Sequence, residues 1–275
     1  MKVNFCTYNY KKPNKVSFSS NARTYITDNK EYIGTMTFLF RDDLDWKKLA
    51  NCAVQNFKNK PKVNVVQFAS SDGSEAYSFI ISMFEECPPF AKKFLPLQAY
   101  DIDPEVVRAA KSGYINLTQT DINNLETHTN RSNKYFTKTG TKLIINNDYV
   151  FESAPNNTGD FAYKTYKASE ELTKNVHFHN KDMYEVLDKM EDNSDTILMC
   201  RNIIGYFNQK SARHFIDKVA KKLKPGSLFV IGEFDCASLK TLDQYIESKN
   251  FVEILPYIYQ KIPNWFRVMK YNFLK

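Results

Sequence analysis

The sequence predicts an α/β fold: a doubly wound, mostly parallel sheet with helices on both faces and an antiparallel hairpin at its C-terminal end. Short apolar runs typical of buried strands alternate with longer stretches of helical periodicity. Such alternation favours parallel strands joined by helical crossovers. At the C-terminal end, two strand-like runs around FVEILPYIY and WFRVMKYNF are joined by the turn QKIPN, which indicates the hairpin.

The elements begin after a polar and aromatic stretch without a clear period, residues 1–34. Residues 43–58 carry apolar side chains at close to helical spacing. The run NVVQFA predicts the first strand, SEAYSFIISMFEE the helix after it, and LQAYDI the second strand. The next helix, DPEVVRAAKSGY, has Pro104 in its first turn and Gly113 at its end, where these residue types are favoured.

Residues 117–175 interrupt the alternation with a segment rich in Asn and Thr. A segment this long inside a compact domain is expected to be functional or an insertion. Within it, KLIINNDYVFE predicts a strand or a hairpin.

The alternation then resumes to the end of the chain. VHFHNKD and DTILMCRNI predict the third and fourth strands, SARHFIDKVAKKLK a helix, LFVIGEF a fifth strand and LKTLDQYIESKN a last helix. We therefore expect an N-terminal extension (1–34), a helical lead-in (35–60) and a sheet domain (61–275) that carries the inserted segment.

Composition excludes several classes of protein. With 275 residues and 43% apolar residues, the chain can bury a sizeable core. The 38 basic and 31 acidic residues give a net charge of +7, which suits an acidic partner but is more typical of a solvated lysine-rich surface. An odd number of widely spaced cysteines favours reduced thiols in a cytoplasm: Cys6, Cys52, Cys87, Cys200 and Cys236. No signal peptide is recognisable, and no apolar run approaches the ~20 residues of a membrane span, so we expect no membrane insertion.

The ends of the predicted strands are the places to look for a ligand site, because ligands of such sheets bind outside the carboxyl ends of the strands. The first strand ends in a turn of small residues, 70–73, which lets a ligand approach the backbone closely. The turn lacks the glycine patterns of dinucleotide and triphosphate loops. Glu75, in the first turn of the next helix, would repel a phosphate and attract an ammonium or sulfonium group, although an acid there is also ordinary helix-dipole chemistry.

Two acids follow the second strand. Asp101 ends the strand, where a carboxylate can accept hydrogen bonds from both hydroxyls of a ribose. Asp103 precedes Pro104 and is placed to cap the next helix. A ligand with a ribose and a cationic amino-acid end, such as S-adenosylmethionine, fits both Asp101 and Glu75.

Five segments in a fixed order complete a recognisable pattern. They are TFLFR (37–41), ASSDGSEAYS (69–78), YDIDP (100–104), MCRNIIGYF (199–207) and LKPGS (223–227). From about residue 35 to about 235, the chain resembles the CheR-type chemotaxis-receptor glutamate methyltransferases, and CRN-x-x-x-YF is its most specific block. The resemblance implies a Rossmann-like class I methyltransferase fold, S-adenosylmethionine as cofactor, S-adenosylhomocysteine as product and a protein glutamate as acceptor.

The resemblance also implies roles for single residues. Arg41 and Tyr206 match the catalytic positions beside the transferred methyl group. Glu75 matches the partner of the methionine amino group, Asp101 the ribose acid and Asn180 a residue near the adenine. The full set of implied cofactor contacts is Thr37, Ala69, Gly73, Glu75, Asp101, Asn180, Arg201 and Asn202.

Each of these residues also has a purely structural interpretation. Arg41 could form a surface salt bridge, Tyr206 could be a core aromatic, Thr37 could cap the following helix, and Asn180 could be a polar strand end. The implied chemistry is nonetheless sound, because a carboxylate is ionised near neutral pH and needs in-line placement rather than a base. An arginine can hold such a carboxylate by a forked hydrogen bond.

The chain departs from the family pattern at several positions. Ser70 replaces a frequent Cys, Ser74 the first Glu of G-E-E, Ala76 a Pro, and Gly205 an apolar residue. After Gly232 the chain reads E-F-D instead of H-S-E, and the next predicted helix follows at once. We therefore expect the small receptor-gripping β-subdomain of the family to be missing and the helical N-terminal domain to be reduced. The cofactor site is expected to be kept and acceptor recognition to be rebuilt.

Three functions remain to be weighed. The first is a carboxylate O-methyltransferase acting on a protein, such as a chemotaxis-type receptor, as a monomer or weak dimer. The second is a catalytically silent module that binds a protein partner, with or without the cofactor. A nicotinamide-dependent oxidoreductase is disfavoured by the missing glycine pattern and by Glu75.

Metal and nucleic-acid binding are not expected. His177 and His179 alternate on a predicted strand, with no acid pair or cysteine at ligand spacing. The aromatic and basic stretch at 265–267 lies in a predicted terminal strand that reads as core.

Overall fold

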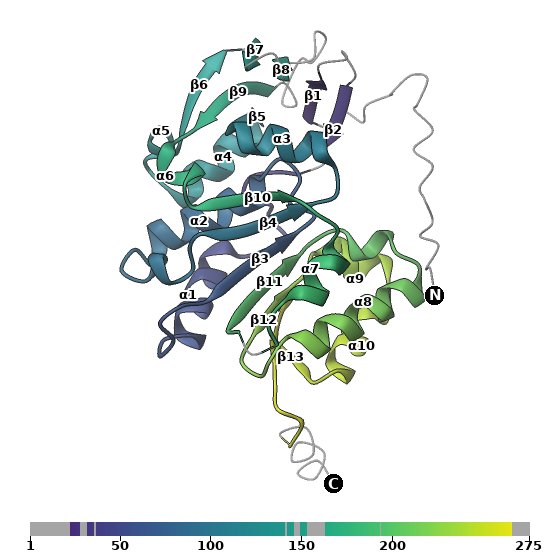
Figure 1. Ribbon diagram of the computed structural model, residues 1–275. Helices are drawn as coiled ribbons and strands as arrows, with labels where there is room; N and C mark the ends of the chain where they lie inside the picture. Colours follow the sequence, from purple (N-terminus) through teal and green to yellow (C-terminus); the bar gives the residue numbers. More distant parts are fainter. Residues whose placement is uncertain are drawn as a thin grey trace.

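The computed structural model describes residues 23–27, 32–35, 37–140, 142–145, 149–152, 163–192 and 194–265. Its centre is a seven-stranded sheet (Figure 1) in the order β10-β4-β3-β11-β12-β14-β13. The strands are β3 (Asn64–Phe68), β4 (Leu97–Asp101), β10 (Val176–Asn180), β11 (Thr196–Cys200), β12 (Leu228–Val230), β13 (Phe251–Leu255) and β14 (Ile258–Lys261). β14 runs antiparallel to both of its neighbours, and the other pairs are parallel. The predicted doubly wound sheet with a C-terminal antiparallel hairpin is confirmed.

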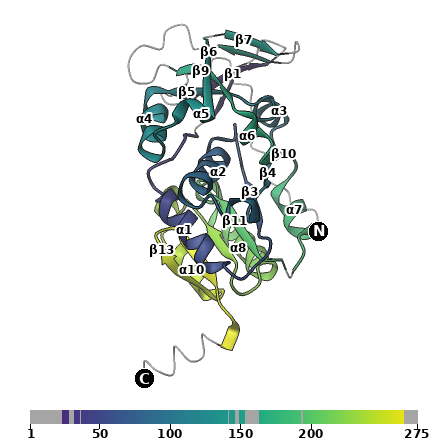
Figure 2. The same cartoon turned by 90° about the vertical axis from the view of Figure 1, so that its left-hand side faces the viewer.

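Helices cover both faces of this sheet (Figures 1 and 2). One face carries α1 (Trp46–Asn56), α2 (Ser74–Glu86) and α3 (Pro104–Ser112), and the other carries α7 (Met183–Lys189), α8 (Gln209–Lys222) and α10 (Leu242–Ser248). Strand β11 shows why two layers of helices are needed, because its side chains alternate between two apolar cores. Ile197 and Met199 join the core under α1 and α2, whereas Leu198 and Cys200 join the core under α8.

The inserted segment forms a small antiparallel β-subdomain beyond β10 (Figure 1). Its three-stranded sheet has the order β5-β9-β6, and a second sheet has the order β2-β1-β8-β7. The strands are β1 (Arg23–Thr27), β2 (Tyr32–Thr35), β5 (Tyr114–Thr118), β6 (Phe136–Gly140), β7 (Lys142–Ile145), β8 (Tyr149–Glu152) and β9 (Tyr163–Ala168); the short helices are α4 (Gln119–His128), α5 (Ser132–Tyr135) and α6 (Glu170–Thr173).

Two expectations about this region have clear outcomes. Of the strand or hairpin predicted in KLIINNDYVFE, the structure has the hairpin, formed by β7 and β8. The helix expected directly after Gly232 is present as α9 (Glu233–Ser238), in place of the receptor-gripping β-subdomain expected to be missing there, but the chain builds an antiparallel β-subdomain ahead of β10 that the sequence did not predict. In addition, β1 and all but the last residue of β2 lie within the stretch expected to be an N-terminal extension, and β1 pairs with β8 of the insertion.

The C-terminal part differs from the prediction in two boundaries. We expected the fifth strand to reach Phe234, but β12 ends at Val230 and α9 (Glu233–Ser238) follows it. The helix begins there because Asp235 accepts the backbone N–H of Gly232 at 2.9 Å and so closes a helical turn. The hairpin turns at Pro256 and Tyr257, whose φ is 64°, so FVEIL pairs with IYQK rather than with WFRVMKYNF. Residues 266–275 lie outside the described residues.

Candidate functional site

The turn after β3 is folded unusually tightly at the carboxyl edge of the sheet. Ala69 and Ser71 each have a φ of 51°, and Gly73 has a φ of 89°. Left-handed backbone is uncommon for residues other than glycine and clusters at functional sites. A Cβ atom on Gly73 would lie 2.5 Å from Cζ of Phe178, so the turn needs glycine both for its φ and for its close approach to β10.

Asp101 ties this turn to the neighbouring strand. Its Oδ2 accepts the N–H of Ser71 at 2.8 Å, and its Oδ1 accepts the N–H of Asp103 at 3.0 Å. Burial raises the pKa of Asp101. Each carboxylate oxygen has a second lone pair, so Asp101 can still accept hydrogen bonds from the ribose hydroxyls. Asp103 caps α3, as predicted, by accepting the N–H of Glu105 at 2.9 Å.

Asn180 ends β10 beside Asp101. Its side-chain amide donates to the carbonyl oxygens of Asp101 at 3.2 Å and Ile102 at 2.8 Å, while the residue stays exposed. Asn180 thus acts as a polar residue that ends its strand, the structural alternative considered above. These hydrogen bonds also hold Asn180 next to the position predicted for the ribose at Asp101.

A buried guanidinium stands between two carboxylates at the end of β11. Arg201 Nη1 donates to Glu75 Oε1 at 2.9 Å, and Nη2 donates to Asp43 Oδ1. The side chain of Arg201 is fully buried, and its Cζ lies 5.1 Å from the ring centre of Trp46. One cation and two anions leave a net charge of −1 at this position, which favours a cationic ligand group.

Burial raises the pKa of Glu75, and Arg201 followed by Arg41 partly offsets the effect. Sequence reasoning missed Asp43 altogether. Its only signal is its place two residues after Arg41, and its partner Arg201 is 158 residues away along the chain.

Several buried polar atoms at this edge have no hydrogen-bond partner within the described part of the chain. They include Ser70 Oγ, Arg201 Nε and Asn202 Nδ2. Buried polar groups are rarely left unpaired, so each of these atoms calls for a partner that the described residues do not provide. A ligand with hydroxyl, carboxylate and ammonium groups would supply such partners, and the residues present fit S-adenosylmethionine.

The two residues predicted to lie beside the methyl group approach the edge from different elements. Arg41 is half-buried, with Cζ 5.6 Å from the ring centre of Phe38, and acts electrostatically on Glu75. Tyr206 ends the short helix η2 (Ile204–Tyr206) and is 55% exposed, so it is not a core aromatic. Its ring centre lies 4.8 Å from that of Phe234.

Thr37 is buried on the same segment as Arg41. It does not cap the following helix, because Asp45 is the cap of α1 and accepts the N–H of Lys48 at 2.9 Å.

Asp235 holds the loop that carries Tyr206. This fully buried carboxylate accepts three backbone N–H groups, those of Asn202 at 2.8 Å, Gly205 at 2.9 Å and Gly232 at 2.9 Å. Burial raises the pKa of Asp235. Sequence reasoning noticed the E-F-D departure but gave Asp235 no role.

Phe234 explains a second departure. A Cβ atom on Gly205 would lie 2.6 Å from Cε1 of Phe234, so the chain has glycine where the family pattern has a larger residue.

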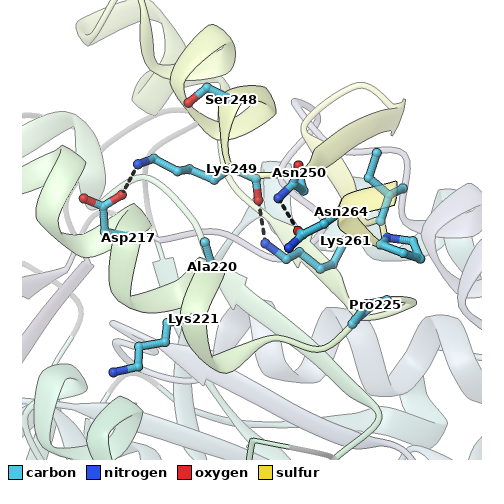
Figure 3. Close-up of a pocket in the computed structure, with 11 residues that line it drawn as sticks. Asp217, Ala220, Lys221, Pro225, Ser248, Lys249, Asn250, Lys261 and Asn264 are labelled. Carbon is cyan, nitrogen blue, oxygen red and sulfur yellow. Dashed lines mark hydrogen bonds and ion pairs between the residues drawn. The ribbon is translucent and has the colours of Figure 1, made fainter. Parts of the chain in front are cut away.

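A wide groove of about 560 Å³ lies elsewhere, at the amino ends of the parallel strands (Figure 3). Its lining includes Lys249, Asn250 and Lys261, and Figure 3 shows the ion pair between Lys249 and Asp217. None of the predicted site residues lines it. The groove contains one left-handed residue, Asn250, and Asp217, whose pKa is lowered by its bonds to Lys249 and Tyr245 despite partial burial. The carboxylates whose pKa is raised by burial, Glu75, Asp101 and Asp235, lie at the opposite edge together with the tight turn after β3, and that edge is therefore the candidate site.

Within the described residues, no group of three or more His, Cys, Asp or Glu side chains is arranged to hold a metal ion. His177 Nδ1 and His179 Nε2 instead contact the side chain of Gln98, at 3.3 Å and 2.9 Å. The same part of the chain contains no helix with the length and apolarity that a membrane crossing requires.

Comparison with known proteins identifies a methyltransferase family. The family described as "CheR methyltransferase, SAM binding domain" matches residues 35–151 and 156–252. The chain is 20% identical to "Chemotaxis protein methyltransferase 2" of Vibrio cholerae, over 74% of this chain and 62% of that protein. It is 26% identical to the protein of the same description from Pseudomonas aeruginosa, over 72% of this chain and 61% of that protein. The chain thus spans less than two thirds of the length of either relative.

Solved structures with a similar arrangement are more distant. A precorrin-6y C5,15-methyltransferase from Geobacter metallireducens aligns with a TM-score of 0.37 and 10% identity, covering 77% of this chain and 76% of that one. The magnesium protoporphyrin IX methyltransferase from Synechocystis aligns with a TM-score of 0.32 and 10% identity, covering 78% and 76%.

Proposed function

The chain belongs to the CheR methyltransferase family through its SAM-binding domain, whose cofactor is S-adenosylmethionine, and from this premise we propose that it methylates a carboxylate, the side chain of a glutamate in a protein acceptor. The observation that carries this proposal is the arrangement of charges around Glu75. A buried, net negative cluster of Glu75, Asp43 and Arg201 lies beside a second guanidinium, that of Arg41.

The two parts of this arrangement suit the two reactants. The negative cluster attracts the cationic methionine end of the cofactor, and Glu75 is its amino-group partner. Arg41 holds the carboxylate of the acceptor through a forked hydrogen bond, which fixes the direction of one oxygen. Electrostatic attraction therefore binds the cationic cofactor at the Glu75 cluster and the acceptor carboxylate at Arg41, in neighbouring positions.

The cofactor, when bound, supplies an electrophilic methyl group on a sulfonium sulfur. The chain contributes binding and orientation. Asp101 accepts hydrogen bonds from the ribose hydroxyls, Asn180 lies near the adenine, and Thr37, Ala69, Gly73 and Asn202 complete the contacts. Because the acceptor carboxylate is already ionised at neutral pH, no general base is needed, and rate enhancement comes from in-line placement.

Exposure of the catalytic pair supports a macromolecular acceptor. Tyr206 is 55% exposed and Arg41 is half-buried, so the position of the methyl group is open to the surface of the molecule. A side chain of a second protein can enter such a site without being fully enclosed. The relatives named chemotaxis protein methyltransferase support a chemotaxis-type receptor as the acceptor.

The test is methyl transfer from S-adenosylmethionine with a radiolabelled methyl group to proteins of the organism that encodes this chain. We expect label in protein that is released as volatile methanol at alkaline pH, because carboxyl methyl esters hydrolyse in base. Alkali-stable label would contradict a carboxylate acceptor. Binding of S-adenosylhomocysteine without any transfer would favour the catalytically silent module instead.

A further inference from the structure

The segment that carries Arg41 has little regular structure of its own. It lies between β2 and α1, and its residue Phe40 has a φ of 49°. A phenylalanine in left-handed backbone is strained and persists only where its surroundings hold it. The positions of Thr37 and Arg41 therefore depend on whatever fixes Leu39 and Phe40.

One helix of the inserted segment provides most of this support. Asp121 of α4 accepts the N–H of Leu39 through Oδ1 at 2.8 Å, and Asn124 Nδ2 donates to the carbonyl oxygen of Leu39 at 3.4 Å. His128, one turn further along the same helix, stacks on Phe40 with 3.9 Å between ring centres and 17° between planes. Residues three and four apart share a helix face, so these three side chains form one continuous contact.

The other side of the segment is fixed by the sheet domain. Ser78 of α2 accepts the N–H of Phe40 at 2.8 Å, one turn after Glu75. The ring of Trp46 meets Phe40 edge-on at 6.1 Å and also lies under Arg201. The segment is thus clamped between the inserted helix α4 and the walls of the candidate site.

We infer that Asp121 is a positioning residue for Arg41, so that the inserted segment is a working part of the methyl-transfer site rather than an appendage. This inference rests on the proposed function of Arg41. Asp121 is fully buried, and its second oxygen, Oδ2, accepts the N–H of Thr118 at 2.8 Å and its hydroxyl at 2.7 Å. A buried carboxylate with three donors is a rigid anchor, because every alternative leaves a charge unpaired.

The arrangement offers a matched control. Asp121 serves both the start of α4 and the Arg41 segment, whereas the Thr118 hydroxyl bonds to Asp121 itself: it accepts the N–H of Asp121 at 3.1 Å and donates to Oδ2 at 2.7 Å. Asp121→Ala removes both functions. Thr118→Val removes the helix cap and one of the three donors to Asp121, and leaves the bond between Asp121 and Leu39 in place. Asp121→Asn keeps an amide oxygen that can accept from Leu39.

The experiment compares these variants in the radiolabelled methyl-transfer assay and in S-adenosylhomocysteine binding. We expect Asp121→Ala to slow transfer by about tenfold to a hundredfold, as small misplacements of catalytic groups do. Cofactor affinity should fall much less, because Thr37 is the one proposed cofactor contact on this segment. Asp121→Asn should restore most of the rate, and Thr118→Val should lower thermal stability while keeping the rate. Equal slowing by Asp121→Ala and Thr118→Val would overturn the inference, because the role of Asp121 would then be only that of a helix cap.

A second measurement separates this inference from the proposed function. Hydrogen–deuterium exchange at the amides of residues 39–41 needs no acceptor and no turnover. If the wild type transfers no methyl group, faster exchange there in Asp121→Ala than in Thr118→Val still supports the positioning role. Equal exchange in the two variants would reject it.

Discussion

Glu75 and Arg201 form a buried ion pair, with 2.9 Å between Oε1 and Nη1, although they are separated by 126 residues of sequence. The pair joins the first turn of α2 to the end of β11 across the point where the strand order reverses. Together with Asp43, it gives the carboxyl edge of the sheet its negative charge. The expected consequences of this arrangement can be measured.

Binding of S-adenosylmethionine should weaken in acid because of Glu75. Burial raises the pKa of Glu75 in the free protein, and a bound cation stabilises its ionised form. Binding therefore releases a proton wherever Glu75 is protonated beforehand, and affinity should fall as the pH drops from neutral towards the usual glutamate value of 4.5. Calorimetry across this range should show a flatter profile for Glu75→Gln. The control is Glu85→Gln, because Glu85 lies on the same helix but pairs with Arg131 away from the site. If both variants lost the dependence of affinity on pH equally, this role for Glu75 would be refuted.

Gly73→Ala should cost more stability than Gly226→Ala. Both glycines have a φ near 90°, but a Cβ on Gly73 would lie 2.5 Å from Phe178, whereas one on Gly226 has nothing within 4 Å. Left-handed strain alone should cost about 1–2 kcal/mol in Gly226→Ala. The collision should add roughly 1–3 kcal/mol in Gly73→Ala. Urea unfolding measures both values, and equal losses would show that the turn does not need its close approach to β10.

Gly205 and Phe234 should behave as a coupled pair. Gly205→Ala places a Cβ 2.6 Å from the ring of Phe234, so Tyr206 should shift and methyl transfer should slow. Removing the ring in Gly205→Ala/Phe234→Ala should relieve the collision and restore part of the rate and stability. A double-mutant cycle should give a coupling of about 1 kcal/mol or more. Strictly additive effects would mean that Phe234 does not determine the need for glycine.

Much of the fold was predictable because it depends on local patterns. The buried strands β3 and β11 are short, mostly apolar segments, and the cap of α3 by Asp103 depends on neighbouring residues. The order of these elements then placed Asp101 and Glu75 at one edge of the sheet.

The missed features depend on contacts between distant residues. Asp43 and Asp121 act on partners 158 and 82 residues away, which no periodicity reveals. The strand expected up to Phe234 ends earlier, because the apolar run stops at Ile231 and the bond from the Gly232 N–H to Asp235 begins a helix there. The expected hairpin lies too far along the chain, because the turn is formed at Pro256 and Tyr257, within the run expected to be one strand.

Lys261, far from the candidate site, should make stability depend on pH in the alkaline range. Burial, with a smaller contribution from Lys249, lowers the pKa of Lys261 from 10.5 to about 8. Between these values the unfolded chain holds a proton that the folded chain has released, so the free energy of unfolding should rise with pH. Any stability advantage of Lys261→Met over the wild type should therefore shrink as the pH rises from about 8 towards 10. Lys221→Met, an exposed lysine of the same groove, is the control, and a pH-independent difference for Lys261→Met would contradict this expectation.

The central claim is that the carboxyl edge of the sheet holds S-adenosylmethionine, with Asp101 on its ribose. Titration calorimetry with S-adenosylhomocysteine tests it most directly on the wild type, on Asp101→Ala and on Asp103→Ala, which disturbs the same loop through the cap of α3. We expect micromolar binding by the wild type, about 8 kcal/mol. Asp101→Ala should lose about 2–3 kcal/mol, as hydrogen bonds to a charged group are removed, while Asp103→Ala should bind nearly as the wild type does. No binding by the wild type, or equal losses in both variants, would contradict the assignment of this edge as the cofactor site.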